Sequence, residues 1–314
     1  MKYVRLLLSI AALLGVALPA GAGEPQYFTL HDLGNGVYAA VGKPGSGAGS
    51  NSGFVIGDDG VAVIDTFQKP AAAEELLATI RGLTQQPVRF VVNTHYHIDH
   101  VAGNGVYHDA GAVLVAQKNV RAWERTENLK FWGDNIPPKV KAMVESLVLP
   151  DLVYDGSIDL YLGSRKLEVR TLPGHTGSDS IVVVPDANIV FCGDLFWNHT
   201  LPNTIDAHVG DWVVSDDRLI TEHPLATFVP GHGEVGRAAD VRALRDYLDT
   251  LRTDVARART AGKEGTELVS TVEAELKPTY SGWGWYSHFI KRNISQEAAE
   301  LAGTKRFPGD PWKK

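Results

Sequence analysis

The chain has 314 residues, 44% of them hydrophobic, with a formal net charge of −7 at pH 7, which fits one sizeable domain with an appended tail. Mild acidity without a clustered basic stripe argues against a nucleic-acid partner. The single cysteine, Cys192, excludes an intrachain disulfide.

Residues 1–22 have the pattern of a secretory signal peptide. A short basic start is followed by an apolar run from Leu6 to Leu18 and by small residues in an Ala-x-Ala arrangement. The apolar run is shorter than the ~20 residues of a transmembrane helix. We expect cleavage after Ala22, which leaves a periplasmic or secreted protein without a stable membrane span. Retention as an uncleaved anchor is the alternative.

The next segments alternate between strand and helix patterns. Short apolar runs predict strands at Val37–Val41, Gly53–Ile56 and Val61–Ile64, with Gly57–Gly60 as the hairpin turn between the last two. Pro70–Leu83 predicts a helix with proline near its first turn.

A histidine-rich loop follows the predicted strand Val88–Val92. On a helix, residues two apart point about 200° away from each other, so His95 and His97 would not reach one ion there. In a tight loop after a strand they can. Asp99 and His100 come next and can turn toward a second position. The spacing therefore predicts ligands for two metal ions.

Three later strand candidates each run into a glycine turn that carries one more candidate ligand. The strands are Leu167–Leu172, Ile189–Cys192 and Thr227–Val229, and the ligands that follow them are His175, Asp194 and His232. An α/β scaffold builds a site from distant sequence by gathering residues at several strand ends in this way. The sequence therefore predicts one metal site assembled from four segments.

In order and context these motifs resemble those of the metallo-β-lactamase superfamily, over roughly residues 27–237. The resemblance implies an α/β fold, a four-layer αββα sandwich, with a dinuclear metal centre that is usually zinc. The family also includes iron oxygenases and inactive members, so the fold alone does not fix the reaction.

The resemblance also implies a role for each motif residue. His95, His97 and His175 match the ligands of the first ion, Asp99, His100 and His232 those of the second, Asp194 the bridging carboxylate, and Asp65 a supporting acid that steadies the histidine loop. Imidazole and carboxylate suit zinc, so we expect two zinc ions as cofactors. Some family members place a cysteine ligand near Cys192, but Asp194 stands where that ligand would be, and Cys192 is expected in the core.

The expected activity is that of a zinc-dependent hydrolase of a small-molecule substrate. A metal-bridging hydroxide would cleave an ester, thioester, lactone or lactam, with Asp99 and Asp194 as the catalytic residues. A Gly-x-Ser-x-Gly elbow, which would indicate a serine nucleophile, does not occur. The alternatives are a periplasmic β-lactamase, a mononuclear iron sulfur dioxygenase and a metal-binding accessory protein without turnover.

After the last ligand, three helices are predicted at Ala238–Ala261, Thr266–Leu276 and about Ser287–Ala302. We expect residues 238–314 to form a helical extension packed on a hydrolase domain of residues 23–237. The aromatic segment Tyr280–Tyr286 is expected to pack on its own core. A flap over the domain and an oligomer contact are the alternatives, and the sequence leaves the oligomeric state open.

Two internal segments are expected near the site. Residues 117–149 predict a helical insertion, broken at 133–138, whose aromatics pack in the core or roof the metals. These aromatics are Trp123, Phe131 and Trp132. The stretch from Leu195 to Trp212 should shape the pocket, and for its His199 and His208 pocket and surface positions are equally favoured.

Overall fold

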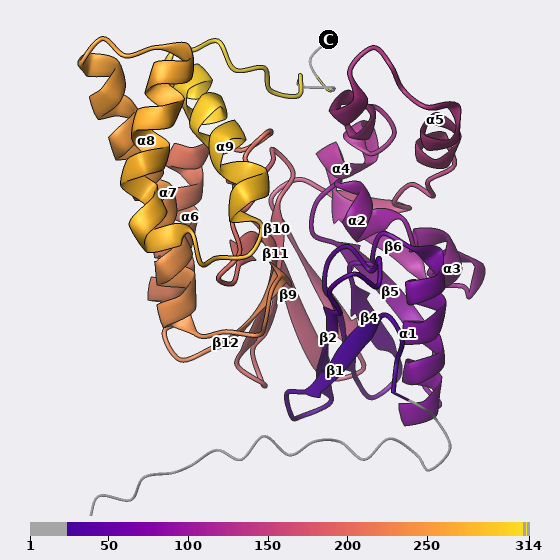
Figure 1. Ribbon diagram of the computed structural model, residues 1–314. Coiled ribbons are helices and arrows are strands. Elements are labelled where there is room, and N and C mark those ends of the chain that lie inside the picture. The colour runs from indigo at the N-terminus through magenta and orange to yellow at the C-terminus, as the bar shows by residue number, and fades with distance from the viewer. Residues whose placement is uncertain (1–23, 310–311, 313–314) are drawn as a thin grey trace, which may run out of the picture.

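Two β-sheets lie face to face in the computed structural model, with helices on both outer sides (Figure 1). The structure describes residues 24–309 and 312, so the predicted signal peptide lies outside the described residues. Within the described part of the chain, no helix combines the length and apolar character needed to cross a membrane.

The first sheet has seven strands in the order β1-β2-β3-β4-β5-β6-β7. Strands β1 to β4 are antiparallel neighbours, and β4 to β7 run parallel. Their bounds are β1 Phe28–Asp32, β2 Val37–Gly42, β3 Ser52–Ile56, β4 Val61–Ile64, β5 Val88–Asn93, β6 Val113–Gln117 and β7 Leu152–Tyr154. Helices α1 (Pro70–Leu83) and α3 (Asn104–Asp109) bury their apolar side chains against the outer face of this sheet.

The second sheet has five strands in the order β12-β11-β10-β9-β8. Only the pair β11·β12 is parallel among them. Their bounds are β8 Ser157–Leu162, β9 Arg165–Thr171, β10 Ser180–Val184, β11 Ile189–Trp197 and β12 Thr227–His232. Alternate side chains of both sheets meet in a buried apolar layer, which includes Val37, Leu167 and Phe191.

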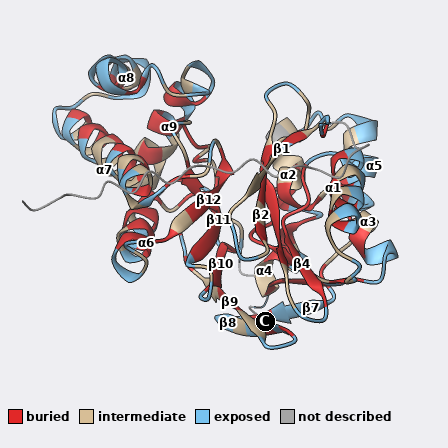
Figure 2. Cartoon of the chain, turned by 90° about the horizontal axis from the view of Figure 1, so that it is seen from below, coloured by how far each residue is buried: buried red, intermediate tan, exposed pale blue. Residues whose placement is uncertain are grey.

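Four helices cover the outer face of the second sheet. They are α6 (Val209–Glu222), α7 (Ala238–Thr260), α8 (Gly265–Tyr280) and α9 (Tyr286–Leu301). Their apolar side chains share one cluster with β11, so the C-terminal helices have no separate core. In Figure 2 both sheets are buried between the helical layers. The predicted four-layer sandwich with C-terminal helices is confirmed, while the boundary at residue 237 stays a prediction.

The predicted insertion contains short helices with the expected break. Helix α4 (Lys118–Trp123) follows β6 directly, and a 3-10 turn, η1 (Glu127–Trp132), and α5 (Pro138–Glu145) lie on either side of residues 133–137. A further short helix, α2 (Ile98–Val101), closes the histidine loop. Helix α6 was not predicted, although its apolar face packs in the same cluster as β11.

Two of the expected strand ends lie elsewhere. Strand β11 continues through Asp194 to Trp197, and β12 continues to His232, where the sequence predicted glycine turns. Gly193, at φ +50°, makes a bulge in the pairing with β12 and does not end the strand. Both ligand candidates therefore lie on extended, hydrogen-bonded backbone, which fixes their direction more firmly than a turn would.

Candidate metal centre

Asp65 holds the histidine loop from the end of β4. Its carboxylate accepts hydrogen bonds from the Thr94 backbone N–H (2.8 Å) and the Thr94 hydroxyl (2.7 Å) and contacts His100 Nδ1 at 2.8 Å. Asp65 itself has φ +58°, a region that a non-glycine residue adopts at a cost and keeps only where its surroundings demand it. The buried carboxylate thereby sets the orientation of the His100 ring.

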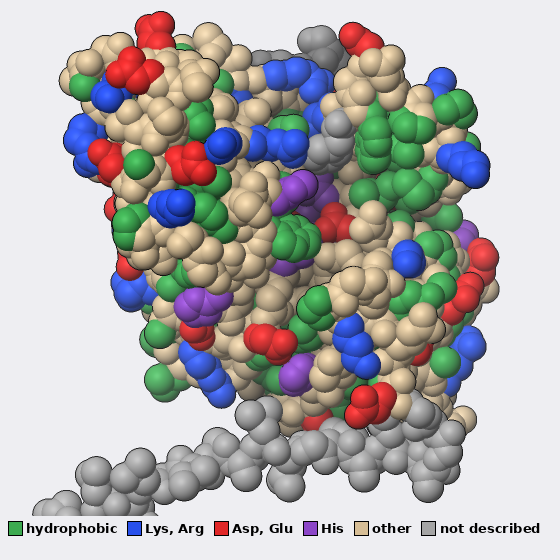
Figure 3. Space-filling view, viewed as in Figure 1, with side chains coloured by type: hydrophobic (Ala, Val, Ile, Leu, Met, Phe, Trp, Pro, Cys, Tyr) green, Lys and Arg blue, Asp and Glu red, His purple; other side chains and the backbone are tan. Residues whose placement is uncertain are grey.

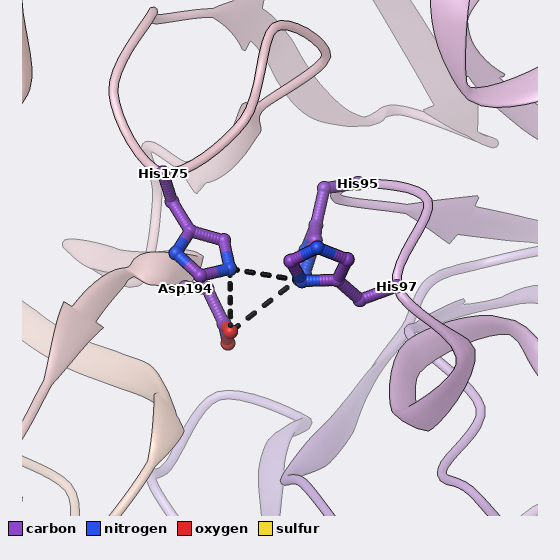
Figure 4. A group of neighbouring side chains, drawn as sticks. All are labelled: His95, His97, His175 and Asp194. Atoms are coloured by element: carbon purple, nitrogen blue, oxygen red, sulfur yellow. Dashed lines mark hydrogen bonds and ion pairs between the residues drawn. The ribbon is translucent and has the colours of Figure 1, made fainter. Parts of the chain in front are cut away.

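The first group of ligand atoms comes from both halves of the sandwich (Figure 4). It consists of His95, His97, His175 and Asp194, all buried, and their ligand atoms lie within 4.8 Å of one another. His175 Nε2 lies 3.0 Å from His97 Nδ1 and 3.1 Å from Asp194 Oδ2. His95 Nε2 lies 3.7 Å from the same carboxylate oxygen. Ligands of a tetrahedral zinc with bonds of about 2.1 Å are about 3.4 Å apart, so these spacings suit that ion.

The second group consists of Asp99, His100 and His232. Asp99 Oδ2 lies 3.3 Å from His232 Nε2 and 3.6 Å from His100 Nε2. The other oxygen of Asp194, Oδ1, lies 3.1 Å from His100 Nε2 and 3.4 Å from His232 Nε2. Asp194 therefore presents one oxygen to each group, as a carboxylate between two cations would.

Two glycines make this position of Asp194 possible. A Cβ on Gly231 would lie 2.0 Å from Asp194 Oδ1, and a Cβ on Gly193 would lie 2.3 Å from the Thr94 hydroxyl oxygen. Neither contact is tolerable, so any side chain there would displace the carboxylate or the loop that carries the first histidines. The glycines next to the ligands thus act by making room for them.

Several polar atoms that face the two groups are buried without a hydrogen-bond partner. They include His95 Nε2, His100 Nε2, His232 Nε2 and Asp194 Oδ1. Such orphaned atoms are costly unless something satisfies them, and here they converge from separate elements. Imidazole nitrogens and carboxylate oxygens are also the donors that zinc prefers. The residues present therefore fit a pair of metal ions.

The pKa values of the histidines shift in opposite directions in the two groups. Burial lowers the pKa of His95 well below its usual value. At His100 burial is outweighed by the carboxylates of Asp194, Asp99 and Asp65, which raise its pKa well above the usual value. At His232 burial is likewise outweighed, chiefly by Asp194, and the pKa rises to about 9. Without ions, protons carry the positive charge that these carboxylates attract, and metal binding would replace them.

Comparison with known proteins decides the family. The model of the metallo-beta-lactamase superfamily matches residues 45–256, a range that contains all seven candidate ligands. The chain belongs to this superfamily. The expectation of a metal-dependent enzyme of this class, drawn from the motifs, is thereby confirmed at the level of the superfamily.

The metallo-beta-lactamase superfamily relatives of the chain differ in what they act on. It is 29% identical over 253 residues to a hydroxyacylglutathione hydrolase of Brucella ovis, covering 79% of this chain and 88% of that protein. It is 20% identical over 297 residues to a linear primary-alkylsulfatase of a Pseudomonas strain, covering 81% of this chain but only 55% of that protein. The solved metallo-beta-lactamase from Pontibacter korlensis has a TM-score of 0.59 at 24% identity, covering 71% of this chain and 99% of the other, and so supports the fold alone.

One residue that supports a candidate ligand, Asp206, was not predicted from the sequence. Asp206, buried in the loop before α6, lies 3.0 Å from His97 Nε2 and accepts a 2.6 Å hydrogen bond from the Tyr96 hydroxyl. The Lys130 ammonium pairs with its other oxygen. Asp206 orients His97 so that Nδ1 faces His175. The only sequence signal was its place in the stretch from Leu195 to Trp212, because a single aspartate in a loop has no motif.

We expect Asp206→Asn to weaken metal binding by ~10- to 100-fold, the usual cost of losing the carboxylate behind a histidine ligand. The amide keeps the shape but has one acceptor oxygen in place of two and no charge, so it cannot accept from both His97 and the Lys130 ammonium. Competition titration against a chromophoric chelator measures the change, with Asp159→Asn on the exposed edge of β8 as the control. Equal zinc affinity in the two variants would contradict this role for Asp206.

A cavity of about 210 Å³ opens beside the metal-ligand candidates. Figure 3 shows this face hollowed between the two halves of the molecule, with histidine and acidic side chains visible inside the hollow. The cavity is lined by His97, Ile98, Asp99, Asn128, Trp132, Asp194, Trp197, Asn203, Trp285 and Phe289. The proposed ligands thus form its base, and aromatic side chains form much of its wall.

The aromatic residues and histidines singled out in the sequence divide between core and pocket. Trp123 packs edge-to-face on Tyr96, whereas Trp132 lines the cavity. In the C-terminal segment Trp283 packs with Tyr280 on the helical core, as predicted, but Trp285 faces the cavity. The side chain of Phe131 lies outside the description.

His199 and His208 stay apart from both ligand groups. His199 is largely exposed and lies 3.7 Å from the Asp240 carboxylate. His208 stacks on Phe307, with ring centroids 3.6 Å apart.

Proposed function

We propose that the chain is a two-zinc hydrolase that cleaves an ester, thioester, lactone or lactam in a small-molecule substrate. His95, His97 and His175 would hold one ion, Asp99, His100 and His232 the other, and Asp194 would bridge them. After removal of residues 1–22 we place the enzyme in the periplasm or outside the cell.

The observation that carries the proposal is the position of the Asp194 carboxylate. One oxygen lies 3.1 Å from His175 Nε2 and the other 3.1 Å from His100 Nε2. A single-metal oxygenase needs only one of these groups, and a protein without turnover needs no cavity beside them. The similarity to the Brucella hydroxyacylglutathione hydrolase supports hydrolysis of a carbonyl bond, and the bond itself is part of the proposal.

The bound zinc pair would supply Lewis acidity, which polarises a carbonyl and makes a water nucleophilic at neutral pH. Asp99 is the least buried carboxylate of the cluster, with 24% of its side chain exposed, and it lines the cavity. Burial opposes its charge, but His100 and His232 outweigh burial and hold the pKa of Asp99 at about 2. Asp99 would take the proton of the attacking water and return it to the leaving oxygen, sulfur or nitrogen. Asn203 lines the cavity and would offer its amide donor to the substrate, whereas Asn128 already donates to the Tyr96 and Glu124 carbonyls.

Metal removal and reloading test this proposal. We expect chelated protein to lose activity by at least ~100-fold and to regain it at two zinc ions per chain, because the ions supply several kcal/mol of transition-state stabilisation. Elemental analysis should accompany hydrolysis assays with phenyl acetate, a γ-lactone, a thioester and a chromogenic β-lactam. One iron and no zinc in active protein would support the dioxygenase alternative. Two zinc ions without turnover of any of the four compounds would support the accessory protein.

A further inference from the structure

The C-terminal helices contribute a wall of the cavity beside the metal-ligand candidates. Trp285 precedes α9 and Phe289 lies in its first turn, and both line the cavity together with Trp197 of β11. The ring centroids of Trp285 lie 5.5 Å from those of Trp197 and of Phe289. These three rings, which we call the aromatic corner, offer an apolar surface to a bound molecule.

The backbone that carries Trp285 is held in place. The Gly284 N–H donates to the His199 carbonyl at 2.9 Å, and the Leu201 N–H donates to the Gly284 carbonyl at 2.8 Å. Trp285 has φ +58°, so its direction is imposed by the surrounding structure against a local preference. The residue is nevertheless 48% exposed. A fixed ring with an open face is suited to packing against a ligand.

Within the described part of the chain, the cavity beside the aromatic corner offers no strongly basic side chain that could pair with a negatively charged substrate group. No Lys or Arg occurs among the described residues that line the cavity. The Lys130 ammonium pairs with the carboxylates of Asp206 and Glu127. The proposed zinc ions would be engaged by the reacting carbonyl, so a carboxylate on the part of the substrate that packs on the aromatic corner would lose its hydration and meet aromatic rings without a Lys or Arg partner.

The size of the cavity limits the ligand as well. At about 210 Å³ it is smaller than the ~300–1,000 Å³ of sites that enclose drug-sized ligands, so the part of the substrate that enters it must be compact; a second hollow of about 690 Å³, lined in part by Lys43 and His232, also borders Trp285. A compact neutral compound with one flat group satisfies both limits.

We propose that the substrate is a small, uncharged ester or lactone whose flat apolar group packs on the aromatic corner, and that Trp285 determines this specificity. The inference rests on the proposed hydrolase function. Trp285 should therefore affect the kcat/KM of substrates with a ring and not that of substrates without one.

Three esters test the inference: phenyl acetate, 4-acetoxybenzoate, which adds a carboxylate, and methyl acetate, which has no ring. Each kcat/KM is divided by the rate constant for hydrolysis of the same ester by hydroxide ion in solution, which corrects for differences between the leaving groups. The zinc-loaded enzyme should prefer phenyl acetate to 4-acetoxybenzoate by ~10-fold or more, since the charged group finds no partner. Trp285→Ala should reduce kcat/KM for phenyl acetate by ~10-fold, mainly through KM, and leave methyl acetate unchanged.

The controls separate specificity from folding. Trp285→Phe keeps a ring and should keep most of the preference, and Tyr161→Ala removes an exposed ring from β8, far from the cavity lining. Zinc content and melting temperature should match the wild type in all three variants. Equal normalised rates for the phenyl and carboxyphenyl esters, or an equal loss on all three esters in Trp285→Ala, would overturn the inference.

If no ester is hydrolysed, the proposed function fails, and the inference is tested by ligand binding instead. Calorimetry with benzamide and 4-carbamoylbenzoate then measures the affinity of the cavity for a neutral and a charged ring. Binding of neutral benzamide that is lost in Trp285→Ala, with no binding of the charged compound, supports the inference. Binding of both compounds, or of neither, refutes it.

Discussion

Asp194→Asn is expected to lower zinc affinity by ~100-fold or more and to abolish most activity. The substitution keeps the shape of the side chain but removes the negative charge between two groups of histidines. Even supporting carboxylates behind metal ligands are worth ~10- to 100-fold, and Asp194 faces both groups directly, with Oδ1 3.4 Å from His232 Nε2. The measurement is a zinc titration of the chelated protein with elemental analysis at saturation.

Cys192→Ser is the matched control, two residues earlier on β11. Cys192 is buried in the hydrophobic cluster under the helices, and its sulfur lies 3.7 Å from the Val190 carbonyl. Replacing it should cost on the order of 1 kcal/mol of unfolding free energy and leave zinc affinity unchanged. The reverse ranking, with Cys192→Ser losing metal and Asp194→Asn retaining it, would overturn the ligand set.

His232→Ala is expected to empty the second group and leave the first. His232 Nε2 lies 3.3 Å from Asp99 Oδ2, and its ring stacks on Trp197 with centroids 3.8 Å apart. Without this imidazole the second ion keeps only Asp99, His100 and one oxygen of Asp194. Zinc stoichiometry should therefore fall from two toward one, and kcat/KM should fall by roughly 100-fold as one of the two Lewis acids is lost.

Measured zinc per chain, together with the binding isotherm, checks the His232 assignment. His108→Ala, a half-exposed histidine on α3, is the control for loss of an imidazole as such. Two ions bound with wild-type affinity in His232→Ala would mean that another residue completes the second group. Loss of both ions would mean that the groups are not separable.

The sequence predicted the fold class and which candidate ligands would lie close together. His95 and His97 lie in the loop after β5, as their spacing required, and Asp99 and His100 lie on the short helix α2 that closes this loop. The structure also brings His175, Asp194 and His232 to that loop, as the order of the motifs implied. Their roles as ligands stay predictions until metal is measured.

The parts that were missed depend on tertiary contacts. Gly193 reads as a turn residue in the sequence, yet pairing with β12 carries β11 past it, and only the three-dimensional register reveals a bulge. Asp206 becomes significant only because the chain folds its loop against His97. Trp283 and Trp285 are two residues apart and equally aromatic, but the left-handed backbone of Trp285 turns one to the cavity while the other packs on the core.

The wall formed by Trp285 and Phe289 comes from a part of the chain that follows the last candidate ligand by more than fifty residues. The residues that would perform the chemistry and those that would determine substrate specificity therefore lie in separate parts of the sequence. Mutations near the start of α9 can reshape what the pocket accepts without altering a metal ligand or the strands that hold it. Substitutions that change the accepted substrate can therefore accumulate in small steps while the candidate metal ligands stay unchanged.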